Sequence, residues 1–290
     1  MPEKPLGVHL DLDGAWERGI LGLPCVNLRE WGPRLRYFAR KDDLDEFVRQ
    51  IEPGLGRFVL YGSGDFHHLS ALLIRRLSAP VTVISFDNHP DWDVRPPRWS
   101  CGGWINRALE FGNVKRAAVW GCGNFELGFP SIVFANHRAL RTGRLEVHAW
   151  AERQASRTRR RFNCMTRENW RARFTRFVQE LNGGEVYVTI DLDCLRAEEV
   201  HSNWENGLFS AGELARALLE IRHSARIVGA DVCGAYSRPA YARWSQRVIA
   251  YFDHPPLPGA WASAQACRAS LEAIWKALTS DMIDGRSSAR

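Results

Sequence analysis

Val81-Thr-Val-Ile-Ser-Phe-Asp-Asn-His-Pro-Asp91 is the stretch of sequence that decides the fold. Its first half is a run of β-branched and apolar residues, which is typical of a strand buried on both faces of a sheet. Its second half carries Asp87, His89 and Asp91, which follow the carboxyl end of that strand. Burying a carboxylate without a partner costs on the order of several kcal/mol. We therefore predict that a cation binds at this strand end.

A second stretch, Val186-Tyr-Val-Thr-Ile-Asp-Leu-Asp193, has the same design and ends in Asp191 and Asp193. Strand-like and helix-like runs alternate along the rest of the chain, which is the pattern of a parallel sheet covered by helices on both faces. We predict an α/β fold with three layers, α-β-α, around a mainly parallel sheet. A chain of 290 residues with 45% hydrophobic content can bury one large core, so we expect a single domain over residues 1–290.

The period of the apolar residues sets the expected elements. The helix at 211–222 is the clearest, because Ser210 and Glu213 have the spacing of a capping box. The other predicted helices span 41–51, 68–78, 103–111, 167–181, 240–251 and 264–279. The predicted strands span 8–13, 58–62, 81–87, 117–121, 145–150, 186–193 and 226–232.

The formal charge of +6 comes largely from an arginine-rich stretch at 153–176. Helical spacing relates the apolar residues in and after this stretch, which are Trp170, Phe174, Phe177 and Leu181. We interpret these residues as the buried stripe of one helix and the arginines as its solvated face. Nucleic-acid binding is therefore not expected.

The cysteines and the N-terminal residues indicate the cellular compartment in which we expect the protein. Seven cysteines, an odd number at scattered positions, favour free thiols in a reducing environment. The first residues, Met-Pro-Glu-Lys-Pro, contain no apolar signal region, and no stretch approaches the roughly 18–20 apolar residues that span a bilayer. We expect a soluble, cytoplasmic protein without a membrane partner.

Several polar groups follow predicted strands and should meet at one edge of the sheet, because ligands of open α/β sheets bind beyond the carboxyl ends of the strands. A glycine turn, Gly62-Ser-Gly-Asp-Phe-His-His68, lies after the second predicted strand. A single Asp-x-His is common by chance. Its combination with Asp-x-Asp and a His-bearing turn is specific. Further acids at strand ends are Asp11, Asp13, Glu126 and Asp231.

Taken in order, these three motifs resemble the signatures of the arginase/agmatinase family of ureohydrolases. Those signatures are a Gly-rich turn ending in His, a strand ending Ser-Phe-Asp-Ala-His-x-Asp, and a strand ending Asp-x-Asp. The resemblance covers roughly residues 58–235. It implies an arginase/deacetylase-like fold and a binuclear site with two Mn²⁺ per chain. It also implies urea-releasing hydrolysis of a C–N bond in a guanidino or amidino group by a metal-bridging hydroxide.

Carried over residue by residue, the resemblance implies that Asp87 and Asp191 bridge both ions. The remaining ligands would divide between the ions, with Asp91 and a turn histidine on one side, and His89 and Asp193 on the other. The implied ligand set is His67, Asp87, His89, Asp91, Asp191 and Asp193.

The identity of the turn histidine is less direct, because the turn is longer here than in the family. We favour His67 as the ligand, since Leu69 two residues later restores the usual apolar spacing. The member of the His67/His68 pair that does not bind metal is then a candidate for acid/base catalysis.

Two positions depart from the family pattern. Many ureohydrolases carry a proton-shuttling His where this chain has Trp104, and a guanidinium-binding Glu where it has Gly234. Trp cannot shuttle protons. Asp13, Glu126 and Asp231 are candidates to supply the missing substrate-binding carboxylate.

Three alternatives remain open beside a hydrolase of small guanidino or amidino compounds. A site that lacks the usual residues for holding a small substrate would suit arginine within a peptide. A metal-dependent deacylase would share the fold but use one Zn²⁺, and the second pair of acids argues against it. A non-catalytic binder would keep the metals and lack the proton shuttle. The resemblance also leaves a homo-oligomer open.

Overall fold

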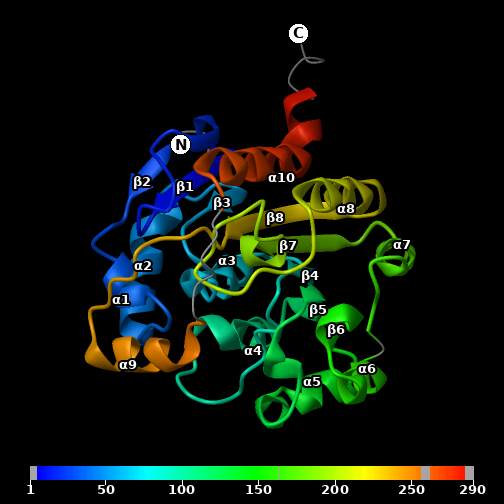
Figure 1. The fold of residues 1–290 in the computed structure, drawn as a ribbon. Coiled ribbons are helices and arrows are strands. Elements are labelled where there is room, and N and C mark those ends of the chain that lie inside the picture. The colour runs from blue at the N-terminus through cyan, green and yellow to red at the C-terminus, as the bar shows by residue number, and fades with distance from the viewer. Residues whose placement is uncertain (1–4, 163, 256–261, 285–290) are drawn as a thin grey trace.

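A sheet of eight parallel strands runs through the centre of the molecule (Figure 1). The computed structural model describes residues 5–162, 164–255 and 262–284. The strands are β1 (Gly7–Asp11), β2 (Cys25–Asn27), β3 (Phe58–Leu60), β4 (Val81–Phe86), β5 (Val114–Cys122), β6 (Leu145–Ala149), β7 (Glu185–Asp191) and β8 (Arg226–Cys233). Their order across the sheet is β2-β1-β3-β8-β7-β4-β5-β6.

Helices cover both faces of this sheet. They are α1 (Gly32–Leu35), α2 (Lys41–Ile51), α3 (Leu69–Arg75), α4 (Trp104–Glu110), α5 (His137–Arg141), α6 (Ser156–Phe162), α7 (Trp170–Gln179), α8 (Ala211–Ser224), α9 (Trp244–Asp253) and α10 (Ala264–Asp284). None of the described helices combines the length and the apolarity that crossing a bilayer requires.

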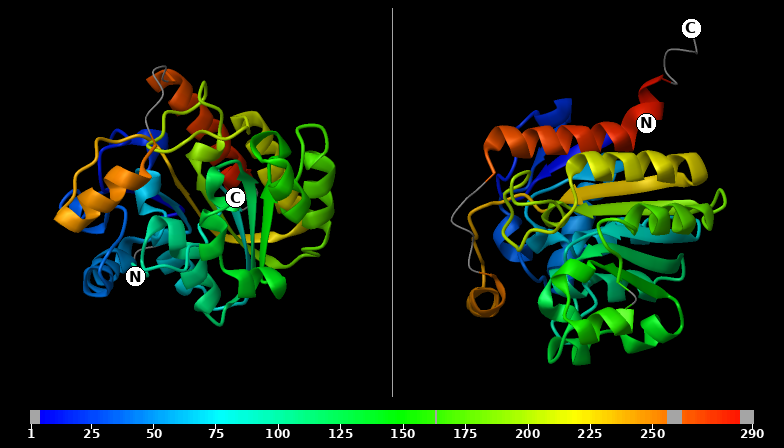
Figure 2. Two further views of the ribbon diagram at one scale, coloured as in Figure 1. Left: turned by 60° about the horizontal axis from the view of Figure 1, so that its bottom comes forward. Right: turned by 45° about the vertical axis from the view of Figure 1, so that its right-hand side comes forward.

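The two faces of the sheet carry separate cores, because successive residues of a strand point to opposite sides. In β4, Val83 belongs to the core under α2, α3 and α4, whereas Ile84 belongs to the core under α7, α8 and α10. The right-hand view of Figure 2 shows the sheet between these two layers. The predicted three-layer α/β fold is therefore confirmed.

Each predicted strand and helix is present, with ends that shift by a few residues. The structure adds β2, an edge strand of three residues, and the short helices α1, α5 and α6. β2, α1 and α5 contain too few residues to show a period, which is why the sequence did not reveal them. Helix α6 is as long as α3 and α4, but it buries Thr158 alone and so has no apolar stripe. The capping box is confirmed, since Ser210 and Glu213 bond each other's backbone N–H groups at the start of α8.

The arginine-rich stretch does not form the single helix that the sequence suggested. Its first part is the separate helix α6, and α7 begins only at Trp170. Phe162 packs against Trp92 in the core on the α4 face, whereas Phe174 lies in the opposite core. The aromatic residues of α7 are buried as predicted, but the arginines are divided between two helices.

Near the middle of the sheet, strands that are consecutive in the sequence are not neighbours in space. β3 and β4 follow one another along the chain, yet β8 and β7 lie between them. An arrangement of this kind leaves a crevice beyond the carboxyl ends of the strands, where α/β sheets bind their ligands. Helix α9 lies apart from both covering layers, at one side of the molecule (Figure 2, orange in the right-hand view).

Candidate metal centre

Two acidic strand ends lie side by side because β4 pairs with β7. Phe86 is in register with Ile190, so the residues that follow them, Asp87 and Asp191, are brought to the same point of the edge. Both carboxylates are buried. The glycine turn approaches from β3, and a Cβ at Gly64 would lie 2.5 Å from Oδ2 of Asp191. Glycine at this position therefore allows the turn to reach the acids.

The candidate ligands form one cluster around His67. Its Nδ1 lies 3.1 Å from Oδ2 of Asp91, 3.2 Å from Oδ2 of Asp87 and 3.5 Å from Oδ2 of Asp191. All these groups are buried. The donor atoms of His67, Asp87 and Asp91 lie within range of one common ion, and Asp191 forms a second such group with His67 and Cys233. The cluster thus contains one imidazole and three carboxylates.

A second cluster adjoins the first and shares Asp87 with it. Nδ1 of His89 lies 2.8 Å from Oδ2 of Asp193 and 3.6 Å from Oδ1 of Asp87. Asp87 therefore turns one carboxylate oxygen toward each histidine. This is the geometry of a carboxylate that can join two neighbouring cation sites.

The electrostatics of the clusters call for positive charge. Burial raises the pKa of Asp191 well above its usual value, and the nearby carboxylates add to the effect. Burial likewise raises the pKa of Asp91 to about 7 and that of Asp193 to about 6. Nδ1 of His67 and Oδ2 of Asp87 have no hydrogen-bond partner in the described part of the chain. Imidazole and carboxylate donors in this arrangement fit divalent cations such as Mn²⁺.

The far side of His67 is fixed by a chain of hydrogen bonds. Nε2 of His67 lies 2.9 Å from the hydroxyl of Thr189, and that hydroxyl donates to Oδ1 of Asp231 over 2.8 Å. Because Thr189 gives its proton to a carboxylate, its oxygen accepts the proton of Nε2. Nδ1 is then left with a lone pair facing the acids.

His89 is oriented by an equivalent contact. Its Nε2 lies 3.1 Å from Oε2 of Glu205, while its Nδ1 faces Asp193. A carboxylate at Nε2 again favours the tautomer that turns a bare Nδ1 toward the candidate cation site. Nothing in the sequence marked Glu205, which lies in the loop between the Asp-x-Asp motif and α8.

Asp91 is held by two further features. Its backbone φ of 46° lies in the left-handed region, which costs energy for a residue with a side chain. The indole Nε1 of Trp104 donates to its Oδ2 over 2.5 Å, and the Trp104 ring lies 4.7 Å from that of His67. Trp104 is buried beneath the cluster, where it supports a carboxylate.

Gly234 is explained by a close approach. Its φ is +99°, and a Cβ there would lie 2.1 Å from Oδ1 of Asp191 and 2.4 Å from the backbone nitrogen of Leu192. A side chain, including the glutamate of the family pattern, would collide with a candidate metal ligand. Glycine is therefore required by this backbone.

Of the predicted substrate-binding acids, Glu126 lies at the metal clusters. It lines the same small pocket as Asp87 and His89, and its Oε2 has no hydrogen-bond partner among the described residues. Burial raises the pKa of Glu126 to about 8, with Asp91 adding to the effect and His89 opposing it. A carboxyl group of this kind can hold a proton at neutral pH.

The structure places Asp13 and Asp231 elsewhere. Asp13 accepts hydrogen bonds from the backbone of Ser63 and from the hydroxyl of Ser237. Asp231 is buried inside β8, and its oxygens accept hydrogen bonds from four hydroxyl groups. The donors are Tyr61, Ser70, Tyr187 and Thr189. Both acids have structural partners, and neither lines the pocket at the clusters.

His68 belongs to none of the candidate ligand groups and does not line the pocket at the clusters. It is fully buried, and neither ring nitrogen has a hydrogen-bond partner within the described ranges. Burial lowers its pKa to about 3, helped by the nearby His67. Of the two turn histidines, His67 is the one that the structure brings to the acids.

The pocket at the clusters is small, about 30 Å³, which is room for roughly one water molecule. Its wall includes three residues that the sequence did not single out for this purpose, Cys101, Trp204 and Asp253. Trp204 stacks against Tyr37 and lies edge-on to His89. These residues come from separate loops and from the end of α9, so no local motif could have indicated them.

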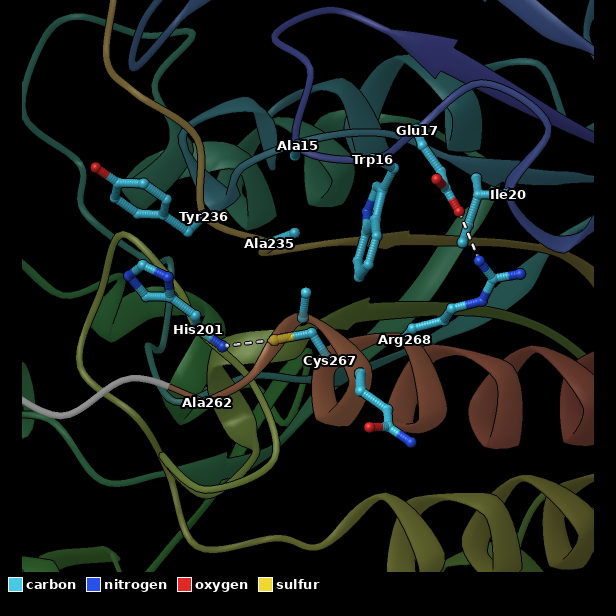
Figure 3. A pocket seen from close by; sticks show the side chains of 12 residues that line it. Ala15, Trp16, Glu17, Ile20, His201, Ala235, Tyr236, Ala262, Cys267 and Arg268 are labelled. Carbon is cyan, nitrogen blue, oxygen red and sulfur yellow. Dashed lines mark hydrogen bonds and ion pairs between the residues drawn. The ribbon is translucent and has the colours of Figure 1, made fainter.

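A larger cavity of about 550 Å³ contains none of the predicted site residues (Figure 3). Trp16 and Ile20 line it on one side, and His201 and Cys267 on the other. An ion pair closes one end of it. The partners are Glu17 and Arg268, 2.6 Å apart.

Comparison with known proteins agrees with this geometry. The model of the Arginase family matches residues 56–243. An uncharacterized protein from Thermotoga maritima is 26% identical over 234 residues, which are 79% of this chain and 80% of that protein.

Solved structures share the fold at low identity. Proclavaminate amidino hydrolase from Streptomyces clavuligerus superposes with a TM-score of 0.54 and 13% identity, covering 95% of this chain and 90% of that one. Formiminoglutamase from Trypanosoma cruzi, in a variant solved with Mn²⁺, gives 0.52 and 13%, covering 94% and 92%.

The sheet, the clusters of candidate metal ligands at its edge and the matched residues define a member of a class of α/β hydrolases. The chain belongs to the Arginase family. Enzymes of this family hydrolyse carbon–nitrogen bonds other than peptide bonds.

Proposed function

We propose that this chain is a binuclear, Mn²⁺-dependent hydrolase that cleaves a C–N bond of a guanidino or amidino group, with release of urea from guanidino substrates. The observation that carries the proposal is the position of Asp87, whose two oxygens face the His67 and His89 clusters. We also infer that residues 1–290 act as one catalytic domain in the cytoplasm.

Six residues would hold the metals. Asp87 and Asp191 would bind both ions. His67 and Asp91 would complete one site, and His89 and Asp193 the other. Two divalent ions in this position lower the pKa of a shared water and supply a nucleophile at neutral pH.

The protein's own groups would handle the substrate and its protons. Glu126 lines the pocket and carries a proton at neutral pH because burial raises its pKa to about 8. Its Oε2 could give this proton to the departing amine and then, as a carboxylate, hold a cationic product. We propose Thr189 and Asp231 as positioning residues for His67.

The first experiment measures metal and product together. The wild-type chain, loaded with Mn²⁺, should hold about two Mn per chain, and one of a set of guanidino and amidino compounds should release urea or ammonia. The set should include arginine, agmatine, guanidino acids and arginine-containing peptides. Asp87→Asn should lose metal and activity together.

Asp45→Asn is the matched control, because Asp45 lies on α2, is partly exposed and pairs with Lys41. It should keep both metal and activity. A wild-type chain that binds no metal after supplementation would refute the proposal, as would one Zn²⁺ per chain with deacylase activity.

A peptide substrate is a second candidate, favoured by exposed aromatic residues beside the pocket acids. Phe125 precedes Glu126 and is 62% exposed, and Phe252 precedes Asp253 and is 81% exposed. Apolar side chains next to an arginine could cover them. Faster urea release from arginine-containing peptides than from free arginine would support this candidate.

A further inference from the structure

Helix α9 brings a carboxylate to the metal pocket from outside the two covering layers. Asp253, its last residue, lines the same pocket as Asp87, Asp193 and Glu126. The hydroxyl of Tyr37 donates a hydrogen bond to Oδ2 of Asp253. The carboxylate is thereby held at the pocket wall, although Asp253 is exposed to solvent.

The position of α9 is itself well fixed. Nε2 of Gln246 is buried and donates to the backbone oxygens of Arg36 and Phe38, over 2.7 and 3.1 Å. Beyond the last turn, Nε2 of His254 lies 2.7 Å from Oδ1 of the buried Asp65. Side chains therefore tie both the first turn and the end of the helix to the body of the protein, which limits the movement of Asp253.

The charges around the pocket leave the carboxylate of Asp253 available to a cationic group of the substrate. The four candidate ligand carboxylates would be balanced by two divalent cations, and Glu126 holds a proton at neutral pH, which leaves Asp253 as a further negative charge on the wall. Arg95 lies within electrostatic range of both acids, but its guanidinium is bound to Asp93 at 2.5 Å. A charged carboxylate on the pocket wall favours a cationic group on the substrate.

The position that would carry a guanidinium-binding glutamate in the family pattern cannot do so here. Gly234 admits no side chain, because a Cβ would lie 2.1 Å from Asp191. A carboxylate that serves the same cationic group must therefore enter the pocket from another element. Asp253 supplies such a carboxylate from the end of α9.

We propose that Asp253 is a substrate-binding residue that holds the cationic guanidinium or amidinium group of the substrate, with Tyr37 positioning its carboxylate. This inference rests on the proposed function for the identity of the site. Helix α9 would then help to determine which substrates the pocket binds.

The test measures binding of a small cation separately from catalysis. Guanidinium chloride at millimolar concentration is titrated into the Mn²⁺-loaded protein by calorimetry, with sodium chloride as the salt control. Asp253→Asn should weaken guanidinium binding by about ten-fold or more, because a charge-assisted pair is lost. Asp253→Glu should recover part of the affinity, and metal content should stay unchanged.

Tyr37→Phe and Asp45→Asn complete the set. Tyr37→Phe keeps the Asp253 carboxylate but removes the hydrogen bond that positions it, so the guanidinium affinity should fall by a smaller factor, about two- to five-fold. For a substrate that the enzyme hydrolyses, KM should change more than kcat. Asp45→Asn should bind guanidinium like the wild type.

Unchanged affinity in Asp253→Asn, within about two-fold, would overturn the inference, even if the wild type releases urea. A wild type that releases no urea but loses guanidinium binding on Asp253→Asn would refute the proposed reaction and leave the inference standing. If Asp253→Asn unfolds α9, the Tyr37→Phe result decides.

Discussion

The indole Nε1 of Trp104 donates a hydrogen bond to Oδ2 of Asp91 over 2.5 Å. Trp104 stands where the family resemblance implies a proton-shuttling histidine. An indole N–H is a donor only and cannot exchange a proton near neutral pH. The residue therefore supports a candidate metal ligand, and proton transfer must fall to another group of the pocket.

Replacing Trp104 by Phe should weaken the metal site without unfolding the protein. Phe keeps the apolar contact with His67 but removes the donor to Asp91. Loss of a contact that orients a ligand typically lowers metal affinity by about ten-fold or more. Calorimetric titration with Mn²⁺ measures the change, with Trp170→Phe on α7 as a control in the opposite core. Equal affinities in both variants would contradict the assigned role.

Thr189→Val should lower Mn²⁺ affinity by about 10–100-fold, because it removes the hydroxyl between His67 and Asp231. Valine has nearly the same shape, so the fold should persist, although Asp231 loses one of its donors. Thr189→Ser keeps the hydroxyl and should retain the wild-type affinity. If valine and serine variants bind Mn²⁺ alike, His67 does not depend on this hydrogen-bond chain.

Gly234→Ala should destabilise the protein by more than about 2 kcal/mol, since the added Cβ meets Asp191 and the backbone has a φ of +99°. Gly234→Glu should not restore the family's guanidinium contact, and it should lower metal content. Urea denaturation and metal analysis provide the measurements. Gly112→Ala is the matched control, because a Cβ there meets nothing within 4 Å of the described structure. Similar stability of both alanine variants would contradict the predicted collision.

The pH dependence of stability should report the state of Glu126 in the metal-free chain. Burial raises the pKa of Glu126 from 4.5 to about 8, so the folded state holds a proton that the unfolded chain releases. The stabilisation is complete below about pH 4.5 and is lost as pH rises toward 8. The glutamine side chain of Glu126→Gln is uncharged at every pH, so this variant should not lose this stability as the pH rises.

The wild type should therefore lose on the order of 1 kcal/mol relative to Glu126→Gln between pH 5 and pH 8, after allowance for partial exposure of the side chain. Denaturant titrations at both pH values give the difference. Parallel pH curves for the two proteins would show that Glu126 is already ionised in the folded state.

The fold was predictable from local pattern because its strands are buried on both faces. The run 81–84 is β-branched and buried at every position, as expected of a strand that helices cover on both sides of the sheet. The edge strand β2 has no such signature, since two of its three residues are exposed. The arginine-rich stretch was misread as one helix because exposed arginines suit a short helix or a long one equally.

The candidate ligands were also within reach of the sequence, because each follows a recognisable strand or turn. The roles of Asp13 and Asp231 were not. Both are acids near strand ends, but hydrogen bonds from Ser63 and from Thr189 occupy them, and these donors lie far from them along the chain. Partners of this kind are set by the packing of separate elements.

The sequence by itself determined the α/β architecture and the two acidic strand ends, since strand burial and the residues that follow a strand are local properties of the chain. Only the tertiary structure decided that Asp87 faces two histidines, that Glu205 and Thr189 orient them, and that Asp253 reaches the pocket. These relations depend on strand order and on the docking of α9, through contacts between residues that the chain separates by tens to hundreds of positions.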